Sequence, residues 1–395
     1  MTEERNMKWI NFLHLYQPVN KDAYFIQEAT EQSYKRIVRA LEENPRTRFT
    51  LNIQGCLFLR WEELGESKLI ARIKKLIEMG QVELTGTCAY HPLAPLVPID
   101  EVEKQIKENE TILRKHFGDN FKPKGFFFPE MAYGVEVAKL VKRLGYEWII
   151  IDEIANGGQF GNVDFAKIYQ DKNSDLKVVF RMRDLSQNFV PDILGNDEAL
   201  KKYKNSNDLY ITATDAELYG LRHIDHTAEF EKLLKNADLN TETISEYIKD
   251  KQIIKTKLVP CNWESTEDEL AKKMPYALWL NPKNKIQKQL WKLVDMTYSV
   301  INNNADDENI NWARWHFVRG LASCTFWWAS GRDFQLFGSI SWSPDEIERG
   351  INEFIRAIRS LHNEDTRSVK IKSEKLYIKI KQLIWNEHWE YRWKK

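Results

Sequence analysis

Residues 125–151 read GFFFPEMAYGVEVAKLVKRLGYEWIII, and this stretch decides the fold class. Gly125–Phe128 and Trp148–Ile151 are runs of consecutive apolar residues, typical of strands buried on both faces of a parallel sheet. Between them, Val135–Leu144 has the pattern of an amphipathic helix, and Gly145 supplies a common helix end. The order strand, helix, strand predicts one repeat of a parallel α/β fold.

The same alternation extends through the first half of the chain. Further strands are predicted at Lys8–Tyr16, Arg48–Ile53, Val82–Thr85, Val178–Met182 and Leu209–Thr212. Helices are predicted at Tyr24–Glu43, Ser67–Met79 and Glu101–Phe117. About seven strands are enough for a closed or nearly closed (β/α) barrel, which is the fold that we expect; a doubly wound sheet is the alternative. No GxGxxG follows the first strand, which argues against a dinucleotide-binding fold.

After about residue 260 the pattern becomes helical. Helices are predicted at Ser265–Leu280, Lys283–Asn302, Asn311–Ala329, Pro344–His362 and Ser373–Trp389. We therefore expect two domains, a (β/α) barrel at residues 1–260 and a helical C-terminal domain at residues 261–395.

The charge balance limits the kinds of partner. Lys+Arg and Asp+Glu both number 58, so the formal net charge is zero, and neither nucleic acid nor an anionic membrane surface is expected as a partner. The 14 Trp residues suit sugar binding, because sugar rings stack on aromatic planes, although most of these rings are expected in the core. The sequence carries no signal for an oligomeric state.

Compartment signals point to the cytoplasm. The chain has no apolar stretch of about 18 residues, and its first residues lack the apolar segment of a signal peptide. The four cysteines are widely spaced and form no CxxC pair, so we expect free thiols in a reducing compartment rather than disulfides or a zinc site.

In a parallel barrel the chemistry lies at the carboxyl ends of the strands. Polar residues at or just after predicted strands are His14, Tyr16, Glu83, His91, Glu130, Asp152, Asp215 and Glu217. A carboxylate after a strand is often only the cap of the next helix, and Asp152 fits that alternative. Structural roles are the plain alternative for His91, His223 and His226. Glu130 fits a cap less well, because it stands between Pro129 and a Met-Ala-Tyr run.

Cleavage of a glycosidic bond needs two carboxyl groups that flank the bond. In the retaining mechanism one attacks the anomeric carbon, while the other donates a proton to the leaving oxygen and later deprotonates water. Glu130 and Asp215, each at a strand end of one barrel, are candidates for this pair.

At these residues the sequence resembles glycoside hydrolase family 57, which contains amylases, 4-α-glucanotransferases and branching enzymes. The resemblance extends over nearly the whole chain and rests on five short regions in the family's order. They are Tyr16-Gln17-Pro18 preceded by His14, Gly80-Gln81-Val82-Glu83, Phe128-Pro129-Glu130, Asp215-Ala216-Glu217-Leu218-Tyr219-Gly220, and Trp263-Glu264 through Trp279. Tyr16 departs from the family pattern, which has His at that position.

The resemblance implies an incomplete (β/α)7 barrel with a helical C-terminal domain, a retaining mechanism on α-linked glucans or oligosaccharides, no cofactor and no catalytic metal. It assigns Glu130 as nucleophile and Asp215 as general acid/base. The substrate-binding residues that it implies are His14, Tyr16, Gln17, Glu83, His91, Asp152, Glu217 and Trp263. Glu217 is expected to orient the site or to contact sugar. Hydrolysis and transglycosylation share the same intermediate, so both stay open.

Two other functions were weighed. A metal-dependent polysaccharide deacetylase binds its metal through an Asp and two His, typically on an H-x3-H, a spacing absent from this sequence; His223 and His226 are the closest pair. A non-catalytic carbohydrate-binding barrel is the other alternative, and the presence of both Glu130 and Asp215 argues against it.

Overall fold

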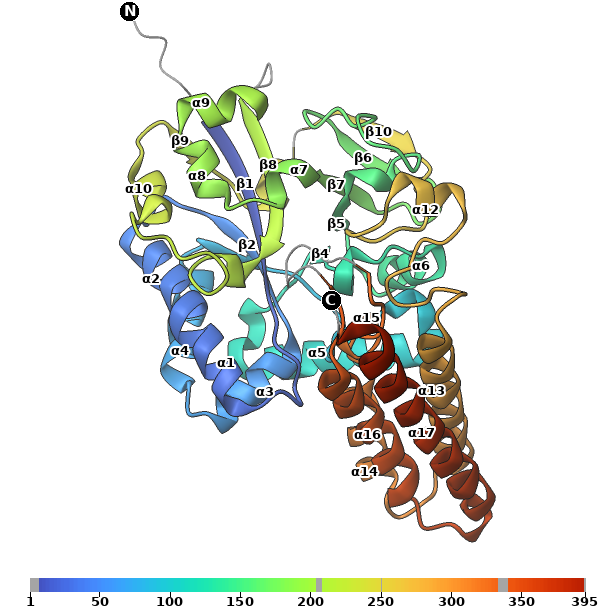
Figure 1. Cartoon of the computed structure of the whole chain (residues 1–395). Helices are drawn as coiled ribbons and strands as arrows, with labels where there is room; N and C mark the ends of the chain where they lie inside the picture. Colours follow the sequence, from blue (N-terminus) through green and yellow to red (C-terminus); the bar gives the residue numbers. More distant parts are fainter. Residues whose placement is uncertain (1–6, 204–207, 250, 333–339, 394–395) are drawn as a thin grey trace, which may run out of the picture. The chain divides into compact units, whose positions relative to one another are not determined.

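The computed structural model describes residues 7–203, 208–249, 251–332 and 340–393, and Figure 1 shows their helices and strands. The chain forms two compact units. The barrel unit comprises residues up to 89 together with 94–263, and the helical unit comprises residues 90–93 and 264 onward. The division into two domains with a boundary after residue 260 remains a prediction.

Two sheets form the wall of the barrel unit. One has the strand order β3-β2-β1-β8 and the other contains β7-β5-β4, and these neighbours pair in parallel. The strands are β1 (Met7–Leu15), β2 (Phe49–Ile53), β3 (Val82–Leu84), β4 (Gly125–Phe126), β5 (Trp148–Asp152), β7 (Lys177–Arg181) and β8 (Leu209–Asp215). All of them were predicted, with ends that differ by a few residues.

The two sheets are joined at both sides. Beyond β3, the amide of Gly86 donates to the carbonyl of Gly125, and the amide of Phe127 donates to the carbonyl of Gly86, both at 2.9 Å. Beyond β7, the amide of Met182 donates to the carbonyl of Ile211 in β8, also at 2.9 Å. The order around the wall is therefore β1, β2, β3, β4, β5, β7, β8. This confirms the predicted incomplete (β/α)7 barrel.

Three further strands were not predicted. β6 (Ile168–Asp171) pairs antiparallel with β7, β10 (Ile253–Thr256) pairs with β6, and β9 (Leu239–Thr241) pairs with the start of β1. They have only three or four residues each, and β10 has no buried residue. All three are too short to show the apolar run by which the barrel strands are recognised, and β9 and β10 are also partly exposed.

Helices follow most barrel strands, as expected for this fold. In the barrel unit they are α1 (Ala23–Ala29), α2 (Lys35–Glu43), α3 (Gly55–Glu63), α4 (Ser67–Glu78), α5 (Ile99–Phe117), α6 (Val135–Arg143), α7 (Arg183–Ser186), α8 (Val190–Leu194), α9 (Asp197–Leu200), α10 (Glu229–Lys235) and α11 (Ile244–Tyr247). The predicted helix Tyr24–Glu43 contains a π-helical segment, Thr30–Tyr34, between α1 and α2. Such segments are often found at functional sites.

The barrel strands are buried on both faces. Along β1, Ile10 and Phe12 belong to the core inside the barrel, whereas Trp9 and Leu13 belong to the core between the wall and its helices. Inside, the ring of Phe12 stacks on that of Phe127 with centroids 5.1 Å apart. This double burial explains why the strands read as continuous apolar runs.

The helical unit is built from α12 (Glu267–Ala271), α13 (Lys285–Asn303), α14 (Ile310–Gly320), α15 (Cys324–Trp327), α16 (Pro344–Ser360) and α17 (Arg367–Glu387), which continues into a π-helical segment, His388–Arg392. The prediction of one helix over Ser265–Leu280 is wrong. Only α12 forms there, because Lys273 takes a positive φ of 57° and Pro275 follows. The predicted helix Asn311–Ala329 is divided into α14 and α15.

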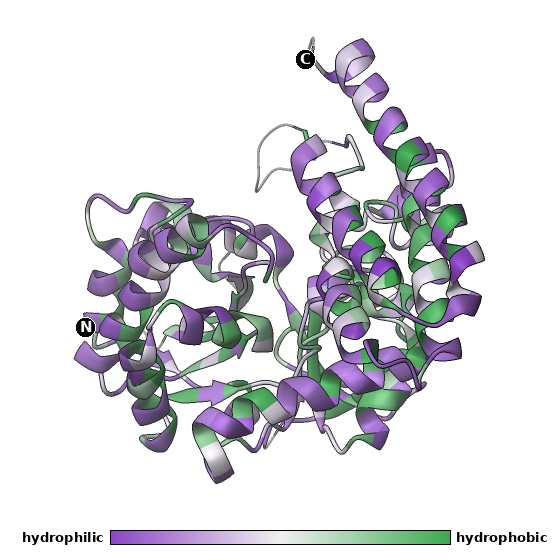
Figure 2. Ribbon diagram, turned by 90° about the horizontal axis from the view of Figure 1, so that it is seen from below, coloured by the Kyte–Doolittle hydropathy of each residue, from purple (hydrophilic) through white to green (hydrophobic). Residues whose placement is uncertain are grey.

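Each unit buries its own apolar side chains. Figure 2 shows hydrophilic residues on the outward faces of the helices and hydrophobic residues toward the interior of each unit. In α16, for example, Ile347, Ile351, Phe354 and Ile358 are buried. Among the described residues, none of the helices combines the length and the apolar character that crossing a bilayer requires.

The join at Gly86 gives a test of the barrel closure. A Cβ atom added there would lie 2.1 Å from the hydroxyl oxygen of Tyr146, whose ring is buried and whose hydroxyl donates to Glu110 at 2.9 Å. We expect Gly86→Ala to lower the free energy of unfolding by about 1–3 kcal/mol, because the overlap forces the wall apart. The measurement is urea unfolding followed by circular dichroism.

Gly80→Ala is the matched control for this substitution. At Gly80 the φ is +72° and nothing lies within 4 Å of an added Cβ, so only the backbone preference is lost, about 1 kcal/mol. If the two variants lose equal stability, the contact of Gly86 with Tyr146 does not constrain the join.

Candidate active site

The register of β1 decides which side chains meet at the carboxyl edge of the barrel. His14 pairs with Asn52 of β2 on one side and with Asp215 of β8 on the other. The Nδ1 atom of His14 lies 2.8 Å from Oδ1 of Asn52, and Nδ2 of Asn52 donates to the Thr85 hydroxyl at 3.1 Å. A row of buried polar side chains therefore crosses the strand ends above an apolar interior.

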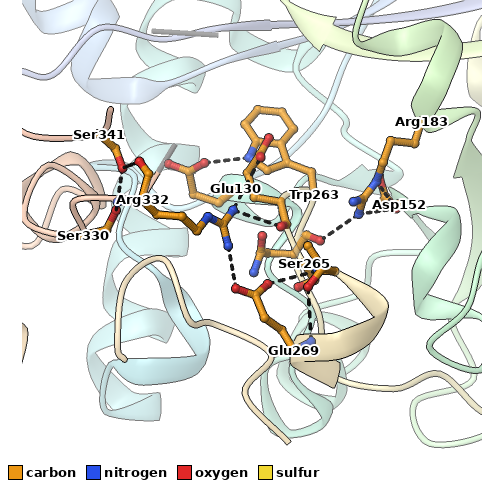
Figure 3. A network of polar contacts seen from close by, with 12 residues as sticks. Glu130, Asp152, Arg183, Trp263, Ser265, Glu269, Ser330, Arg332 and Ser341 are labelled. Carbon is orange, nitrogen blue, oxygen red and sulfur yellow. Dashed lines mark hydrogen bonds and ion pairs between the residues drawn. The ribbon is translucent and has the colours of Figure 1, made fainter. Parts of the chain in front are cut away.

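Glu130 reaches this edge on a constrained turn. It follows β4 after the buried rings of Phe127 and Phe128, and it is 5% exposed. Its φ is 60° and that of Met131 is 49°, so two consecutive non-glycine residues are left-handed. Such strain persists where the surrounding structure enforces it. The indole nitrogen of Trp263 donates to Oε2 of Glu130 at 2.9 Å, and this contact fixes the carboxylate (Figure 3).

Trp263 connects Glu130 with the β1 row. Its ring lies 6.2 Å from that of His14 and 6.2 Å from that of Phe127, measured between centroids. The amide of Trp263 also donates to the carbonyl of Glu130 at 3.2 Å. Because His14 is the register partner of Asp215, these contacts bring the two predicted catalytic carboxylates to one mouth of the barrel.

Arg181, at the end of β7, supports Trp263 from the other side. Its guanidinium lies over the indole ring at 5.4 Å from the centroid and donates to the carbonyl of Trp263 at 3.2 Å. It also donates to the carbonyl of Ala213 at 3.0 Å and pairs with Asp152 at 2.8 Å. Arg183 pairs with the same carboxylate at 2.7 Å (Figure 3).

These contacts enclose the side chain of Asp152. Its side chain is 0% exposed, both oxygens accept from arginines, and Oδ1 also accepts from the amide of Ile154. Its oxygens are thus occupied by donors of the protein itself. We therefore propose that Asp152 positions Arg181 and Trp263, in place of the predicted sugar contact.

Asp215 ends β8 and is 7% exposed. Nη1 of Arg222, from the loop that follows, donates to its Oδ2 at 2.7 Å. The ion pair is mostly buried, so the guanidinium compensates the charge of a carboxylate that has little contact with bulk water.

Glu217 lies beside this pair and is 1% exposed. Gln17 donates to its Oε1 at 2.8 Å, and the hydroxyl of Tyr34 donates to the same oxygen. Burial raises the pKa of Glu217 to about 7; the charge of Asp215 adds to the increase, while Arg222 and Tyr34 oppose it. Near neutral pH this carboxyl therefore exists in both protonated and ionised forms.

The π-helical segment holds the loop that carries these carboxylates. Ser33 donates to the carbonyl of Ala216 at 2.6 Å. A Cβ atom at Gly220 would lie 2.2 Å from the carbonyl oxygen of Gln32, and the φ of Gly220 is +128°. The glycine of the Asp-x-Glu-x-x-Gly motif is therefore required, because backbone meets backbone there without room for a side chain.

His14 and Tyr16 lie next to each other on this edge. Their rings stack with centroids 5.7 Å apart, and Tyr16 is half-buried. Burial lowers the pKa of His14 to about 4, which the neighbouring Asp215 carboxylate opposes only in part. His14 is thus a neutral hydrogen-bonding group at physiological pH.

The structure does not place Glu83 and His91 in this group. In the strand register Glu83 lies opposite Thr50, which precedes Asn52 by two residues along β2. Its Oε2 accepts from the Thr50 hydroxyl and from the amide of Ser245 in α11, both at 3.1 Å. Burial raises its pKa. His91 belongs to the helical unit, where its Nδ1 lies 3.0 Å from the Ser323 hydroxyl.

Sequence reasoning missed three residues of the site. Arg222 lies in the loop after Asp215 and pairs with it. Its position a few residues after Asp215 and Glu217 in the sequence was a signal that could have identified it. Tyr34 lies inside a predicted helix, and Arg181 lies in a predicted strand; neither carried a signal, because the contacts with Glu217 and Asp152 join segments far apart in sequence.

Among the described residues, no group of three or more His, Cys, Asp and Glu is placed to hold a metal ion. His223 stacks on Phe189 with centroids 4.1 Å apart and faces Asp192 at 3.5 Å.

Comparison with known proteins shows the family of the chain. Residues 3–261 match glycosyl hydrolase family 57. The chain is 27% identical over 141 residues to alpha-amylase 1 of Dictyoglomus thermophilum, covering 36% of this chain and 20% of that protein. It is 23% identical over 260 residues to a 4-alpha-glucanotransferase of Thermococcus litoralis, covering 61% of this chain and 39% of that protein.

The fold agrees as well. The structure of a branching enzyme of Thermococcus kodakaraensis superposes with a TM-score of 0.69 at 14% identity, covering 95% of this chain and 96% of that chain. The matches to the two curated relatives span one fifth and two fifths of their lengths, 20% and 39%.

The buried His14 predicts a pH dependence of stability. The imidazole binds a proton near pH 6.5 when unfolded and only near pH 4 when folded. The unfolded state therefore binds more protons between these values, so stability decreases as the pH falls through this window, by roughly 3 kcal/mol in full. We expect this part of the loss to be absent from His14→Gln, as measured by urea unfolding from pH 7.5 to 4.

His226→Gln is the matched control, because His226 is exposed. It should follow the wild-type pH dependence. If His14→Gln also follows it, His14 is protonated in the folded protein at higher pH than the structure indicates.

Proposed function

The chain belongs to glycosyl hydrolase family 57, and we propose that it is a retaining enzyme acting on α-linked glucans or oligosaccharides. The observation that carries this proposal is the convergence of Glu130 and Asp215 at one mouth of the barrel, each mostly buried and each held by one nitrogen donor. Two such carboxyl groups are what cleavage of a glycosidic bond requires. The names of the relatives, an alpha-amylase and a 4-alpha-glucanotransferase, support the choice of substrate.

We assign Glu130 as the nucleophile. An oxygen of its carboxylate forms a bond to the anomeric carbon while the glycosidic C–O bond breaks, which gives a covalent glycosyl-enzyme intermediate. The donor from Trp263 and the left-handed turn hold the carboxylate in one orientation before substrate arrives. Preorganisation of this kind lowers the barrier, because little rearrangement remains for the reaction step.

We assign Asp215 as the general acid/base. In the first step it gives a proton to the leaving oxygen, and in the second it takes a proton from the acceptor that attacks the intermediate. That acceptor is water in hydrolysis and a sugar hydroxyl in transglycosylation, and the proposal includes both.

Glu217 supports Asp215 in this scheme. Burial and the charge of Asp215 raise the pKa of Glu217, so its carboxyl keeps a proton to higher pH than a carboxyl in water. Asp215 is the more exposed of the two and lies in register with His14 at the mouth, so we assign the proton transfer to Asp215 and not to Glu217.

His14, Tyr16, Gln17 and Trp263 are our proposed sugar-binding residues around the pair. Neutral imidazole, phenol and amide groups bind hydroxyls, and an indole offers an apolar face to a sugar ring. We further propose the cytoplasm as the location, supported by four free cysteine thiols, three of them buried.

Substitution with chemical rescue tests the two roles separately. Glu130→Ala and Asp215→Ala should each lose at least about a thousandfold in kcat on a maltooligosaccharide. On a nitrophenyl α-maltooligoside with added azide, Glu130→Ala should give a β-glycosyl azide, because azide replaces the missing nucleophile. Asp215→Ala should give an α-glycosyl azide, because azide then attacks the intermediate formed on Glu130.

Product configuration is read by NMR. Glu136→Ala, which removes an exposed carboxylate from α6, is the control and should keep full activity. Full activity of both alanine variants would refute the assignment. If Glu217→Ala but not Asp215→Ala gives the α-azide, Glu217 is the acid/base instead.

Arg222 gives a test of the Glu217 carboxyl. Its charge lowers the pKa of Glu217, which is about 7, so Arg222→Gln should raise that pKa. We expect the ionisation step near pH 7 in the profile of kcat/KM to move upward by about one unit. Arg222→Lys keeps the charge and should keep the step in place. An unchanged profile in Arg222→Gln would show that Glu217 does not control the pH dependence.

A further inference from the structure

The helical unit contains a pocket of about 610 Å³ that the catalytic scheme does not use. Its walls come from the start of α13, the end of α17 with the following π-helical segment, and residues 329, 330 and 342. The volume lies in the range of small-ligand sites. The residues that matter below are Asn281, Trp342, Asn386, Glu390, Tyr391 and Arg392.

One wall of the pocket is rigid. The indole nitrogen of Trp342 donates to Nδ1 of His388 at 3.2 Å, and the guanidinium of Arg392 lies over the indole at 5.5 Å. Arg392 in turn donates to the carbonyl of Gly331 at 3.2 Å and pairs with Glu387 at 3.0 Å. A Cβ at Gly331, whose φ is +62°, would lie 2.3 Å from this guanidinium, so glycine makes the close approach possible.

Another part of the lining offers groups for a ligand. Within the described part of the chain, no hydrogen bond engages the amide of Asn386, the carboxylate of Glu390 or the hydroxyl of Tyr391. The ring of Tyr391 is 61% exposed. Asn281 accepts from the amide of Lys283 through Oδ1 at 2.9 Å, which turns its NH2 group away from that contact.

The chemistry of the lining selects a class of ligand. The lining contains three cations (Lys283, Lys285 and Arg392) and two anions (Glu387 and Glu390). Arg392 and Glu387 form an ion pair with each other. This near balance disfavours phosphates and other polyanions. Side-chain amides and a carboxylate bind neighbouring hydroxyls, while an open aromatic face covers apolar C–H groups. A neutral polyhydroxylated ring presents both features.

We propose that this pocket is a second oligosaccharide site, which binds a short segment of α-linked glucan and takes no part in bond cleavage. The glucosyl ring stacks on Tyr391, and its hydroxyls bond to Asn386, Glu390 and the NH2 group of Asn281. This inference rests on the proposed function, which supplies the glucan. Such a site retains a long substrate on the protein between cleavage events.

Calorimetric titration of the full chain tests the proposal. Glu130→Gln is used as the background so that maltohexaose is bound but not turned over. We expect two maltohexaose molecules per chain. Tyr391→Ala or Asn386→Ala in this background should weaken one site about tenfold or more and leave the other unchanged. Lys379→Ala, an exposed change on α17 outside the pocket, should leave both sites intact.

The outcomes separate this inference from the proposed function. Binding of a single maltohexaose that both pocket variants leave unchanged would overturn the second site, while turnover by the wild type would still support the function. Loss of pocket-dependent binding in Tyr391→Ala, together with absence of turnover by the wild type, would support the pocket and refute the function. Circular dichroism checks that each variant is folded.

Discussion

The pairing of β1 with both β2 and β8 is the constraint on which the site depends. In this register the ring of His14 lies between Asn52 and Asp215 and near Trp263, which holds Glu130. A shift of one residue would turn His14 toward the outer helices and bring Leu13 into the barrel mouth. The apolar side chains below, Ile10 and Phe12, keep the register because they fill the barrel interior.

Two buried carboxyl groups lie side by side in the site, and each has its own donor. Arg222 donates to Asp215, and the hydroxyl of Tyr34 donates to Glu217, whose pKa burial raises. Asp152 has different surroundings, since it is fully buried and two arginines pair with it. Carboxylates at strand ends of one barrel thus differ in their neighbours, and our proposed roles follow those neighbours.

Much of the fold could be predicted from sequence. The seven barrel strands are buried on both faces, so each appears in the sequence as a continuous apolar run. The helix predicted over Ser265–Leu280 failed where Lys273 and Pro275 interrupt an apparently periodic segment. The catalytic pair was assigned through ordered motifs, not through spacing. Contacts across long sequence separations, such as Tyr34 with Glu217 and Arg181 with Asp152, leave no local pattern, so these residues could not be found from sequence alone.

The π-helical segment Thr30–Tyr34 sets the rotation of α2 about the helix axis relative to α1. An α-helix advances about 100° per residue, so one extra residue accommodated in a wide turn rotates everything after it by about that angle. Without the extra residue, α2 would be rotated by that angle about its axis, and its buried residues Ile37, Val38 and Leu41 would turn away from their present packing. With it, α2 packs on the barrel wall while the turn before it faces the loop at Gly220. A single helical stretch can thereby pack into the core through α2 and contact the loop that carries Asp215 and Glu217 through its π-helical segment.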